Sequence, residues 1–332
     1  MRQRRQFLRT ATLVVAYTLA APFGANPLWA QSGFPTKLVR VIVPYAAGGG
    51  PDVLTRKVGP RLSEILGQNV VVENIVGAGG ILAAQSAARA APDGYTLLLG
   101  ASTHITQKAM QPSVKFDPMK DFVHITRTTV SPQLLVVAAD GPYKTVQELV
   151  AAIKASPGKL NYASGGIGSA AHLAGAALDN ALQLQSVHVP YKGSVEIIPS
   201  ILQGATQYGF PVSSSAVAMV QQGKVRALAT TSGTRLAQLP NVPTLKEALG
   251  KDELVLESWG GIWAPAGTPP AVVEVLFKAY QKLYADPALR AEHEAAGTLV
   301  SLSASPAEFT QFMMAETSKY ERLVKATNLM VN

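Results

Sequence analysis

Three glycine-rich segments are the first feature of this sequence that could support chemistry. They span residues 46–50, 77–80 and 164–168, and each stands between an apolar run and a helical pattern. Glycine lets the backbone approach a ligand closely, and free N–H groups at the start of a helix attract anions. Each segment is therefore a candidate cradle for a carboxylate or a phosphate, although any one of them would also suit an ordinary strand-to-helix turn.

The glycine patterns do not match those of nucleotide-binding proteins. The segment that begins at Gly77 and runs through Ile81 and Leu82 lacks the final glycine of the dinucleotide pattern G-x-G-x-x-G. No glycine-rich stretch ends in Gly-Lys-Ser or Gly-Lys-Thr, as phosphate-binding loops require. The sequence therefore disfavours a kinase or a dehydrogenase, and we predict no cofactor.

A serine hydrolase is an alternative, because Ser169 and His172 stand three residues apart at the start of a predicted helix. No G-x-S-x-G elbow surrounds the serine, which argues against it. His172 would either bond the nearby loop or contact a ligand. The histidines lack the spacings of metal sites and cysteine is absent, so we predict no metal. Asp52 is expected to cap the helix that follows the first glycine-rich segment.

Composition limits the remaining classes of protein. The chain has 332 residues, of which 48% are hydrophobic and 15% charged, enough for two α/β lobes. The net charge of +8 owes much to Arg2, Arg4, Arg5 and Arg9, and no block of Lys and Arg occurs later. A nucleic-acid partner is therefore not expected.

The N-terminus resembles an export signal. The arginines precede an apolar run over residues 11–21, and the segment closes with Pro27-Leu28-Trp29-Ala30. The run is shorter than the roughly 20 residues needed to span a bilayer as a helix. We predict that residues 1–30 are a cleaved signal peptide, of the general or the twin-arginine type, and that the mature protein lies in the periplasm.

The elements that must position the glycine-rich segments follow from the apolar pattern. Strands are predicted over residues 38–43, 70–72 and 95–99, with helices over 52–67 and 81–91 between them. This alternation predicts parallel strands joined by right-handed crossovers.

A second series of strands and helices follows over residues 134–230, and a strand over 254–264 returns to the first series. We predict an α/β fold with one lobe from residues 31–137 plus 255–332 and another from 138–254. Two crossovers between the lobes would form a hinge, and the cleft between them is the expected site.

Several motifs along the mature chain have a specific order and spacing. These are Val43-Pro44-Tyr45-Ala46-Ala47-Gly48-Gly49-Gly50, Val72-Glu73-Asn74, Pro92-Asp93-Gly94-Tyr95-Thr96-Leu97, Pro157-Gly158-Lys159-Leu160-Asn161-Tyr162, His188-Val189-Pro190-Tyr191-Lys192-Gly193, Arg226-Ala227-Leu228-Ala229 and Ala264-Pro265-Ala266-Gly267-Thr268-Pro269. In these motifs the chain resembles the Bug family of extracytoplasmic solute receptors, which includes the binding components of tripartite tricarboxylate transporters.

The resemblance implies a two-lobed periplasmic-binding-protein fold of type II, the Venus flytrap arrangement, with two hinge crossovers. It also implies that one loop of each lobe grips a ligand carboxylate through backbone N–H groups, hydroxyls and water. The ligand-binding residues expected on this basis are Tyr45, Ala46, Ala47, Gly48, Gly49, Asp52, Ala78, Ser102, Thr103, His104, Ser164, Gly165, Gly168, Ser169, His172, Tyr191, Pro211 and Ser213.

One residue departs from the family pattern, since Pro51 stands where a threonine is usual and removes both a hydroxyl and an N–H. The implied partners are a small organic carboxylate and the membrane subunits of a tripartite tricarboxylate-type transporter, with the receptor itself a monomer and not an enzyme. A dicarboxylate, an acidic amino acid and an aromatic acid all fit. A sensor-kinase ectodomain is the alternative partner.

Overall fold

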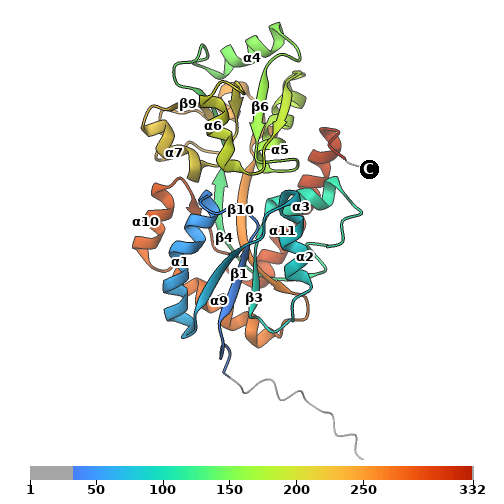
Figure 1. Ribbon diagram of the computed structural model, residues 1–332, viewed down its shortest axis with the longest axis vertical. Coiled ribbons are helices and arrows are strands. Elements are labelled where there is room, and N and C mark those ends of the chain that lie inside the picture. Colours follow the sequence, from blue (N-terminus) through green and yellow to red (C-terminus); the bar gives the residue numbers. More distant parts are fainter. Residues whose placement is uncertain (1–32, 331–332) are drawn as a thin grey trace, which may run out of the picture. The chain divides into compact units, whose positions relative to one another are not determined.

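The computed structural model describes residues 33–330 of the protein (Figure 1). The signal peptide predicted at residues 1–30 lies outside the described residues. Within residues 33–330, no helix has both the length and the apolar character needed to cross a membrane.

The first of two sheets is mixed and has six strands. In spatial order they are β11 (Leu299–Val300), β4 (Phe122–Pro132), β10 (Glu257–Pro265), β3 (Thr96–Ala101), β1 (Val39–Val43) and β2 (Val70–Asn74). As predicted, β1 pairs in parallel with β2 and β3. The returning strand β10 runs antiparallel between β3 and β4, and β11 pairs antiparallel with β4 at the edge. Of these strands, β4 and β11 were not predicted.

Helices cover both faces of this sheet and complete the first lobe. They are α1 (Gly50–Leu66), η2 (Ala78–Gly80), α2 (Ile81–Ala88), α3 (Ser102–Met110), α9 (Pro270–Leu283), α10 (Pro287–Ala295) and α11 (Pro306–Ala326). On β1, Val41 and Val43 join the core that includes residues of α1 and α9, whereas Ile42 joins the core with residues of α2, α3 and α11. Successive side chains of a strand point to opposite faces, so burial on both faces explains why only Arg40 interrupts this apolar run.

The second lobe is built on a five-stranded sheet. Its strands, in spatial order, are β7 (Val187–Pro190), β6 (Asn161–Ser164), β8 (Tyr208–Gly209), β5 (Leu134–Ala138) and β9 (Val225–Thr230). β6 pairs in parallel with β7 and β8, but β5 runs antiparallel to β8 and β9, so this sheet is also mixed. Its helices are α4 (Val146–Ala155), α5 (Ala170–Leu182), η3 (Ser194–Glu196), α6 (Ile197–Leu202), α7 (Ser213–Gln221), α8 (Leu245–Leu249) and η4 (Asp252–Leu254).

Two adjacent crossovers connect the sheets. The chain passes from β4 to β5 at Gln133 and returns between Leu256 and Glu257. Thr231 bonds both segments, because its N–H donates to the Gln133 carbonyl at 2.9 Å and its carbonyl accepts from the Leu256 N–H at 2.9 Å. The two connections are therefore tied together.

Candidate functional site

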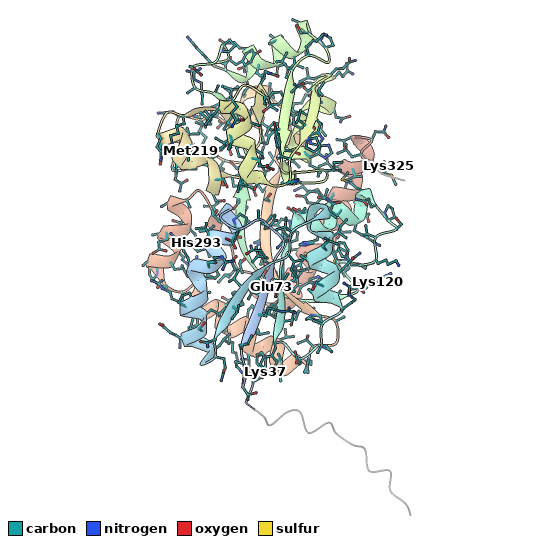
Figure 2. All side chains as sticks on the ribbon, in the orientation of Figure 1. Lys37, Glu73, Lys120, Met219, His293 and Lys325 are labelled. Atoms are coloured by element: carbon teal, nitrogen blue, oxygen red, sulfur yellow. The ribbon has the colours of Figure 1, made fainter. Side chains whose placement is uncertain are left out.

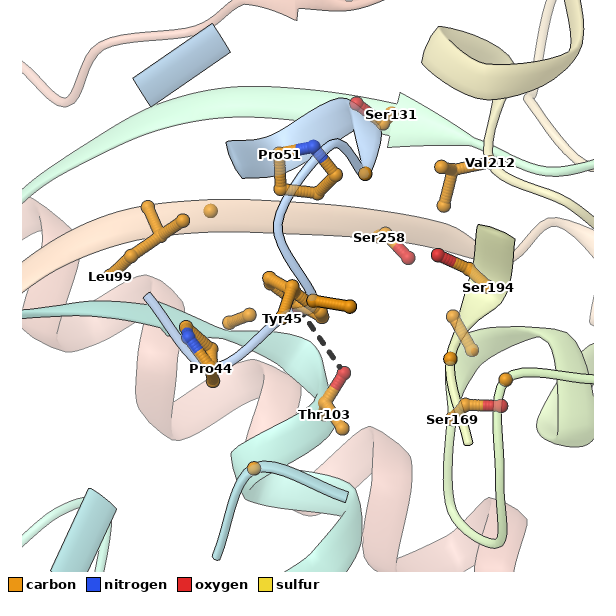
Figure 3. Close-up of a pocket in the computed structure, with 18 of the residues that line it drawn as sticks. Pro44, Tyr45, Pro51, Leu99, Thr103, Ser131, Ser169, Ser194, Val212 and Ser258 are labelled. Atoms are coloured by element: carbon orange, nitrogen blue, oxygen red, sulfur yellow. Dashed lines mark hydrogen bonds between the residues drawn. The ribbon is translucent and has the colours of Figure 1, made fainter. Parts of the chain in front are cut away.

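A cavity of about 790 Å³ is lined by residues of both lobes. From the first lobe, the loop that includes Tyr45 and Ala46 reaches it, as do residues of β3, β4 and β10. From the second lobe, its wall includes Gly165 and Gly166 of a glycine-rich loop. In Figure 3, Pro51, Ser131 and Ser258 of the first lobe lie across this space from Ser169 and Ser194 of the second. The cavity thus includes the cleft between the lobes.

Four helices begin at this cleft, two from each lobe. The residues at their N-termini that line it are Gly49 and Pro51 for α1, Ala101 and Thr103 for α3, Ser169 and Ala170 for α5, and Val212 and Ser214 for α7. The first N–H groups of a helix have no partner within the helix, and the helix dipole places partial positive charge there. The arrangement therefore places uncharged hydrogen-bond donors and positive electrostatic potential together in the cleft.

The side chains around the cleft suit an anion. Among the described residues that line it, there is no Asp, Glu or Arg, and the single lysine is Lys192. The hydroxyl oxygens of Ser169 and Ser258 already accept hydrogen bonds, from the His172 N–H at 3.3 Å and from Gln133 Nε2 at 2.7 Å respectively. Each hydroxyl therefore keeps its own proton to donate to a ligand.

Asp52 has a different place from the one predicted. The N-cap of α1 is Gly49, which makes no side-chain cap, and Asp52 lies in the first turn at only 2% exposure. Its carboxylate accepts from the Gly48 N–H at 2.9 Å, Asn74 Nδ2 at 2.8 Å and Arg56 Nε at 3.0 Å. Burial would raise the pKa of Asp52, but these hydrogen bonds, led by that from Asn74, lower it below its ordinary value. Asp52 therefore holds the shape of the loop.

The second-lobe loop is shaped by two stacked histidines. His172 Nδ1 accepts from the Gly168 N–H at 3.0 Å, and the imidazole rings of His172 and His188 lie 3.9 Å apart between centroids. Burial lowers the pKa of His172 to about 3, with His188 adding to that shift, and burial lowers the pKa of His188 to about 4. Both rings are neutral at pH 7, and His188 Nε2 lies 2.6 Å from the Ser164 hydroxyl.

This geometry does not assemble a hydrolase site at Ser169. Its hydroxyl oxygen accepts from the backbone N–H of His172, and the imidazole Nδ1 of His172 is already occupied by the Gly168 N–H. Activation of a serine needs a base within hydrogen-bond reach of its hydroxyl. The hydroxyl of Ser169 acts here as a helix cap.

One buried amide joins the lobes across the cleft. Gln107 of α3 is 1% exposed, and its Nε2 donates to the Ile167 carbonyl of the second lobe at 2.6 Å. Gln111 Nε2 donates to Gln107 Oε1 at 3.1 Å, which fixes the orientation of the Gln107 amide. A Cβ placed on Gly79 or on Gly168 would lie 1.9 or 2.3 Å from Gln107 Nε2. Glycine at both positions thus allows this amide to lie between one loop of each lobe.

The cleft is lined by eight of the residues predicted from the sequence: Tyr45, Ala46, Gly49, Ala78, Thr103, Gly165, Ser169 and Tyr191. The others lie behind it or beside it: Ala47, Gly48, Asp52, Ser102, His104, Ser164, Gly168, His172, Pro211 and Ser213. Several of these serve the backbone of the site. His104 is fully buried and its Nδ1 accepts from the Ala101 N–H at 3.1 Å, while Ser213 Oγ donates to the Gly297 carbonyl at 2.5 Å.

Several cleft residues were not predicted. Ser131 of β4 and Ser258 of β10 come from the strands that lead to the crossovers, and Ser194 and Ser214 come from η3 and α7. The strand Tyr208–Gly209 is followed by the serines that open the helix Ser213–Gln221. Serines that follow a strand are a helix-start signal, so this pattern could have revealed α7. Nothing in the local pattern marks Gln107, because its role depends on the other lobe.

Comparison with known proteins agrees with this geometry. Residues 54–329 match the model of the tripartite tricarboxylate transporter family receptor, TctC. A protein of Cupriavidus necator, described as the UPF0065 protein in the gbd 5'region, is 38% identical over 97% of both chains. BugT of Bordetella pertussis is 31% identical over 93% of both chains.

Solved structures give the same result. The periplasmic binding protein BugD is 31% identical, with a TM-score of 0.84 over 90% of this chain and 99% of its own. MatC from Rhodopseudomonas palustris with bound malate is 31% identical, with a TM-score of 0.82 over 88% of this chain and 100% of its own. An R. palustris protein with adipate is 28% identical, with a TM-score of 0.84 over 89% of this chain and 98% of its own.

The predicted two-lobed periplasmic-binding fold is therefore confirmed. The chain belongs to the tripartite tricarboxylate transporter receptor family, as a periplasmic solute-binding protein of the Bug and TctC type.

Proposed function

We propose that this protein captures a small carboxylate in the cleft between its lobes and delivers it to the membrane subunits of a tripartite tricarboxylate-type transporter. The observation that carries the proposal is the meeting of four helix N-termini, α1, α3, α5 and α7, at a cleft without acidic side chains among its described lining residues. Malate and adipate, bound by two similar proteins, are ligands of the same chemical class.

The donors that would hold the carboxylate are largely uncharged. Backbone N–H groups of the helix starts, together with the hydroxyls of Ser169 and Ser258, provide fixed dipoles without a buried cation. A dipole that is already oriented needs little rearrangement when the anion arrives, and it acts more strongly once water has left the cleft. Pro51 contributes no N–H, so the start of α1 offers one donor fewer than it would with another residue there.

Closure of the lobes would exclude that water. The crossovers at Gln133 and at Leu256 are short and adjacent, which suits a hinge. The Gln107 amide and the Ile167 carbonyl form a contact that exists only while the lobes are close. Binding and closure would then favour each other, and the closed form would be the one that the transporter recognises.

We propose binding without catalysis, because the hydroxyl of Ser169 caps a helix and has no imidazole or carboxylate within hydrogen-bond distance among the described residues. We also propose that the chain is exported and acts in the periplasm as a monomer. Uptake of the bound acid by cells, with and without the gene for this chain, tests the delivery step.

A thermal-shift screen tests the binding step. The panel holds mono-, di- and tricarboxylates, amino acids, and the amide of each acid. At 100 times its Kd, a ligand stabilises the fold by about 2.7 kcal/mol, which moves the Tm measurably. We expect an acid to raise the Tm while its amide does not. If a neutral compound raises the Tm and no acid does, the proposal is wrong.

A matched pair of serine variants locates the binding. Ser258→Ala removes a hydroxyl donor from the cleft, whereas Ser63→Ala removes one that donates to the Gly59 carbonyl within α1, outside the cleft. A hydrogen bond to a charged group contributes about 1.5–3 kcal/mol, so Ser258→Ala should weaken binding of the acid at least tenfold. Ser63→Ala should leave the Kd unchanged.

A further inference from the structure

The cavity does not end at the cleft but continues into the core of the first lobe. We call this part the inner chamber, and its walls are Leu54, Val58, Leu99, Ile262, Tyr280 and Tyr284. None of these side chains is more than 9% exposed. The chamber lies under α1, at the end of α9, and its surface is mostly aliphatic and aromatic.

One polar atom of the chamber has no hydrogen-bond partner among residues 33–330. His293 of α10 is fully buried and lines the same cavity; Figure 2 labels it on the first lobe. Its Nδ1 lies 2.9 Å from the Leu289 carbonyl, so Nδ1 carries the proton and donates to that oxygen. Nε2 is then a neutral acceptor, and no group among the described residues donates to it.

The surroundings keep this imidazole in place and uncharged. The ring of Tyr284 packs edge-on against it, with centroids 5.4 Å apart. Burial lowers the pKa of His293, outweighing the bond to Leu289 and the charge of Glu292, which raise it; Lys57 lowers it further. A buried acceptor without a donor costs free energy, so a group that donates to Nε2 would be favoured at this place.

We infer that the inner chamber receives the apolar body of the ligand, and that His293 Nε2 accepts a hydrogen bond from a hydroxyl group at the far end of that body. The substrate class is then a hydroxylated aromatic or alicyclic monocarboxylic acid. The inference rests on the proposed function, because the carboxylate of that acid would lie at the helix N-termini of the cleft.

A second carboxylate does not fit the chamber as well as a hydroxyl does. No Lys or Arg is among the described residues that line the chamber, and Nε2 presents a lone pair rather than a proton. Burial of an unpaired carboxylate costs far more than burial of a hydroxyl. A short dicarboxylate would therefore have to keep both charged groups in the cleft and leave the chamber unused.

Isothermal titration of the purified chain with acids of graded length tests this inference. The probes are 4-hydroxybenzoate, 4-hydroxyphenylacetate and 3-(4-hydroxyphenyl)propionate, each paired with the acid that lacks the hydroxyl, and succinate as a short dicarboxylate. We expect at least one hydroxylated acid to bind about tenfold more tightly than its parent, the effect of one additional hydrogen bond, and more tightly than succinate.

Two variants and one control assign the effect to the chamber. His293→Leu should reduce the tenfold preference for the hydroxylated acid to about one. His124→Leu is the matched control, because His124 is a buried histidine of the same lobe that bonds the Pro118 carbonyl and does not line the cavity. Val58→Phe, which fills the chamber, should weaken the aromatic acids while leaving succinate unaffected.

The outcomes separate this inference from the proposed function. If succinate or another small acid binds and no hydroxylated acid exceeds its parent, the chamber inference is overturned and carboxylate capture stands. If no carboxylate binds at all, carboxylate capture fails and the chamber inference with it. A preference that survives in His293→Leu, or that disappears equally in His124→Leu, also overturns the role of His293.

Discussion

Replacement of Gln107 by leucine should weaken closure of the lobes while leaving the stability of the fold nearly unchanged. The amide is 1% exposed, and its Nε2 donates to the Ile167 carbonyl across the cleft at 2.6 Å. Leucine keeps a similar volume between the loops of Gly79 and Gly168 but cannot donate. Because the bond joins two lobes, its loss should penalise the closed form more than the open one.

The size of the effect follows from the surroundings of the acceptor. Ile167 is an exposed residue, so we expect water to replace the amide at its carbonyl once the lobes separate, and the loss should be close to the ordinary net value of about 1 kcal/mol. Since about 1.4 kcal/mol equals a factor of ten, the Kd for the ligand should rise about fivefold. The Tm of the ligand-free protein should change little.

Isothermal titration and thermal unfolding measure the two quantities. The matched control is Gln147→Leu, because Gln147 Nε2 donates to the Ala248 carbonyl at 2.9 Å within the second lobe. An unchanged Kd in Gln107→Leu, or an equal change in Gln147→Leu, would refute the claim that the Gln107 bond stabilises closure.

Three further substitutions test the structure of the site and its support. Asp52→Asn should lower the free energy of unfolding by about 2 kcal/mol, since hydrogen bonds to a buried charge are lost. Because the folded pKa of Asp52 is lowered, the stability that its charge contributes is present above about pH 4 and is lost as the pH falls further. The difference between the unfolding free energies measured in urea at pH 6 and at pH 3 should therefore be smaller in the variant than in the unchanged protein. Gly79→Ala should abolish ligand binding in titrations, because φ there is +62° and the added Cβ would lie 1.9 Å from Gln107 Nε2; normal binding would show that the loop adjusts. Gly100→Ala should cost about 1–3 kcal/mol in urea unfolding, because its Cβ would lie 2.0 Å from the ring of Trp263; an unchanged midpoint would mean that the ring moves aside.

The parts of the fold that were predicted correctly are those whose pattern is local. The run Val39–Val43 is apolar except for Arg40 and is followed by Pro44, so its strand was evident. The strand Phe122–Pro132 was missed because its buried side chains include His124, Thr126 and Thr128. Their burial depends on partners from distant parts of the chain, such as the Gly260 carbonyl that accepts from Thr128.

The candidate site shows the same division. The glycine-rich loops were found from the sequence because a strand, glycines and a helix follow one another directly. Whether a residue in such a loop faces the cleft or the core depends on packing. His104 and His172 are both buried and do not line the cleft. The serines of β4 and β10 and the chamber around His293 come together only through the fold, so no spacing in the sequence indicated them.

The most direct test of carboxylate capture between the lobes is isothermal titration of the acid that raises the Tm most, beside its own amide. We predict a single site per chain and an affinity for the acid about 100-fold above that for the amide, because the helix N-termini favour the negative charge. Equal affinities for the acid and its amide, or binding of the amide alone, would contradict the claim that this cleft is built for a carboxylate.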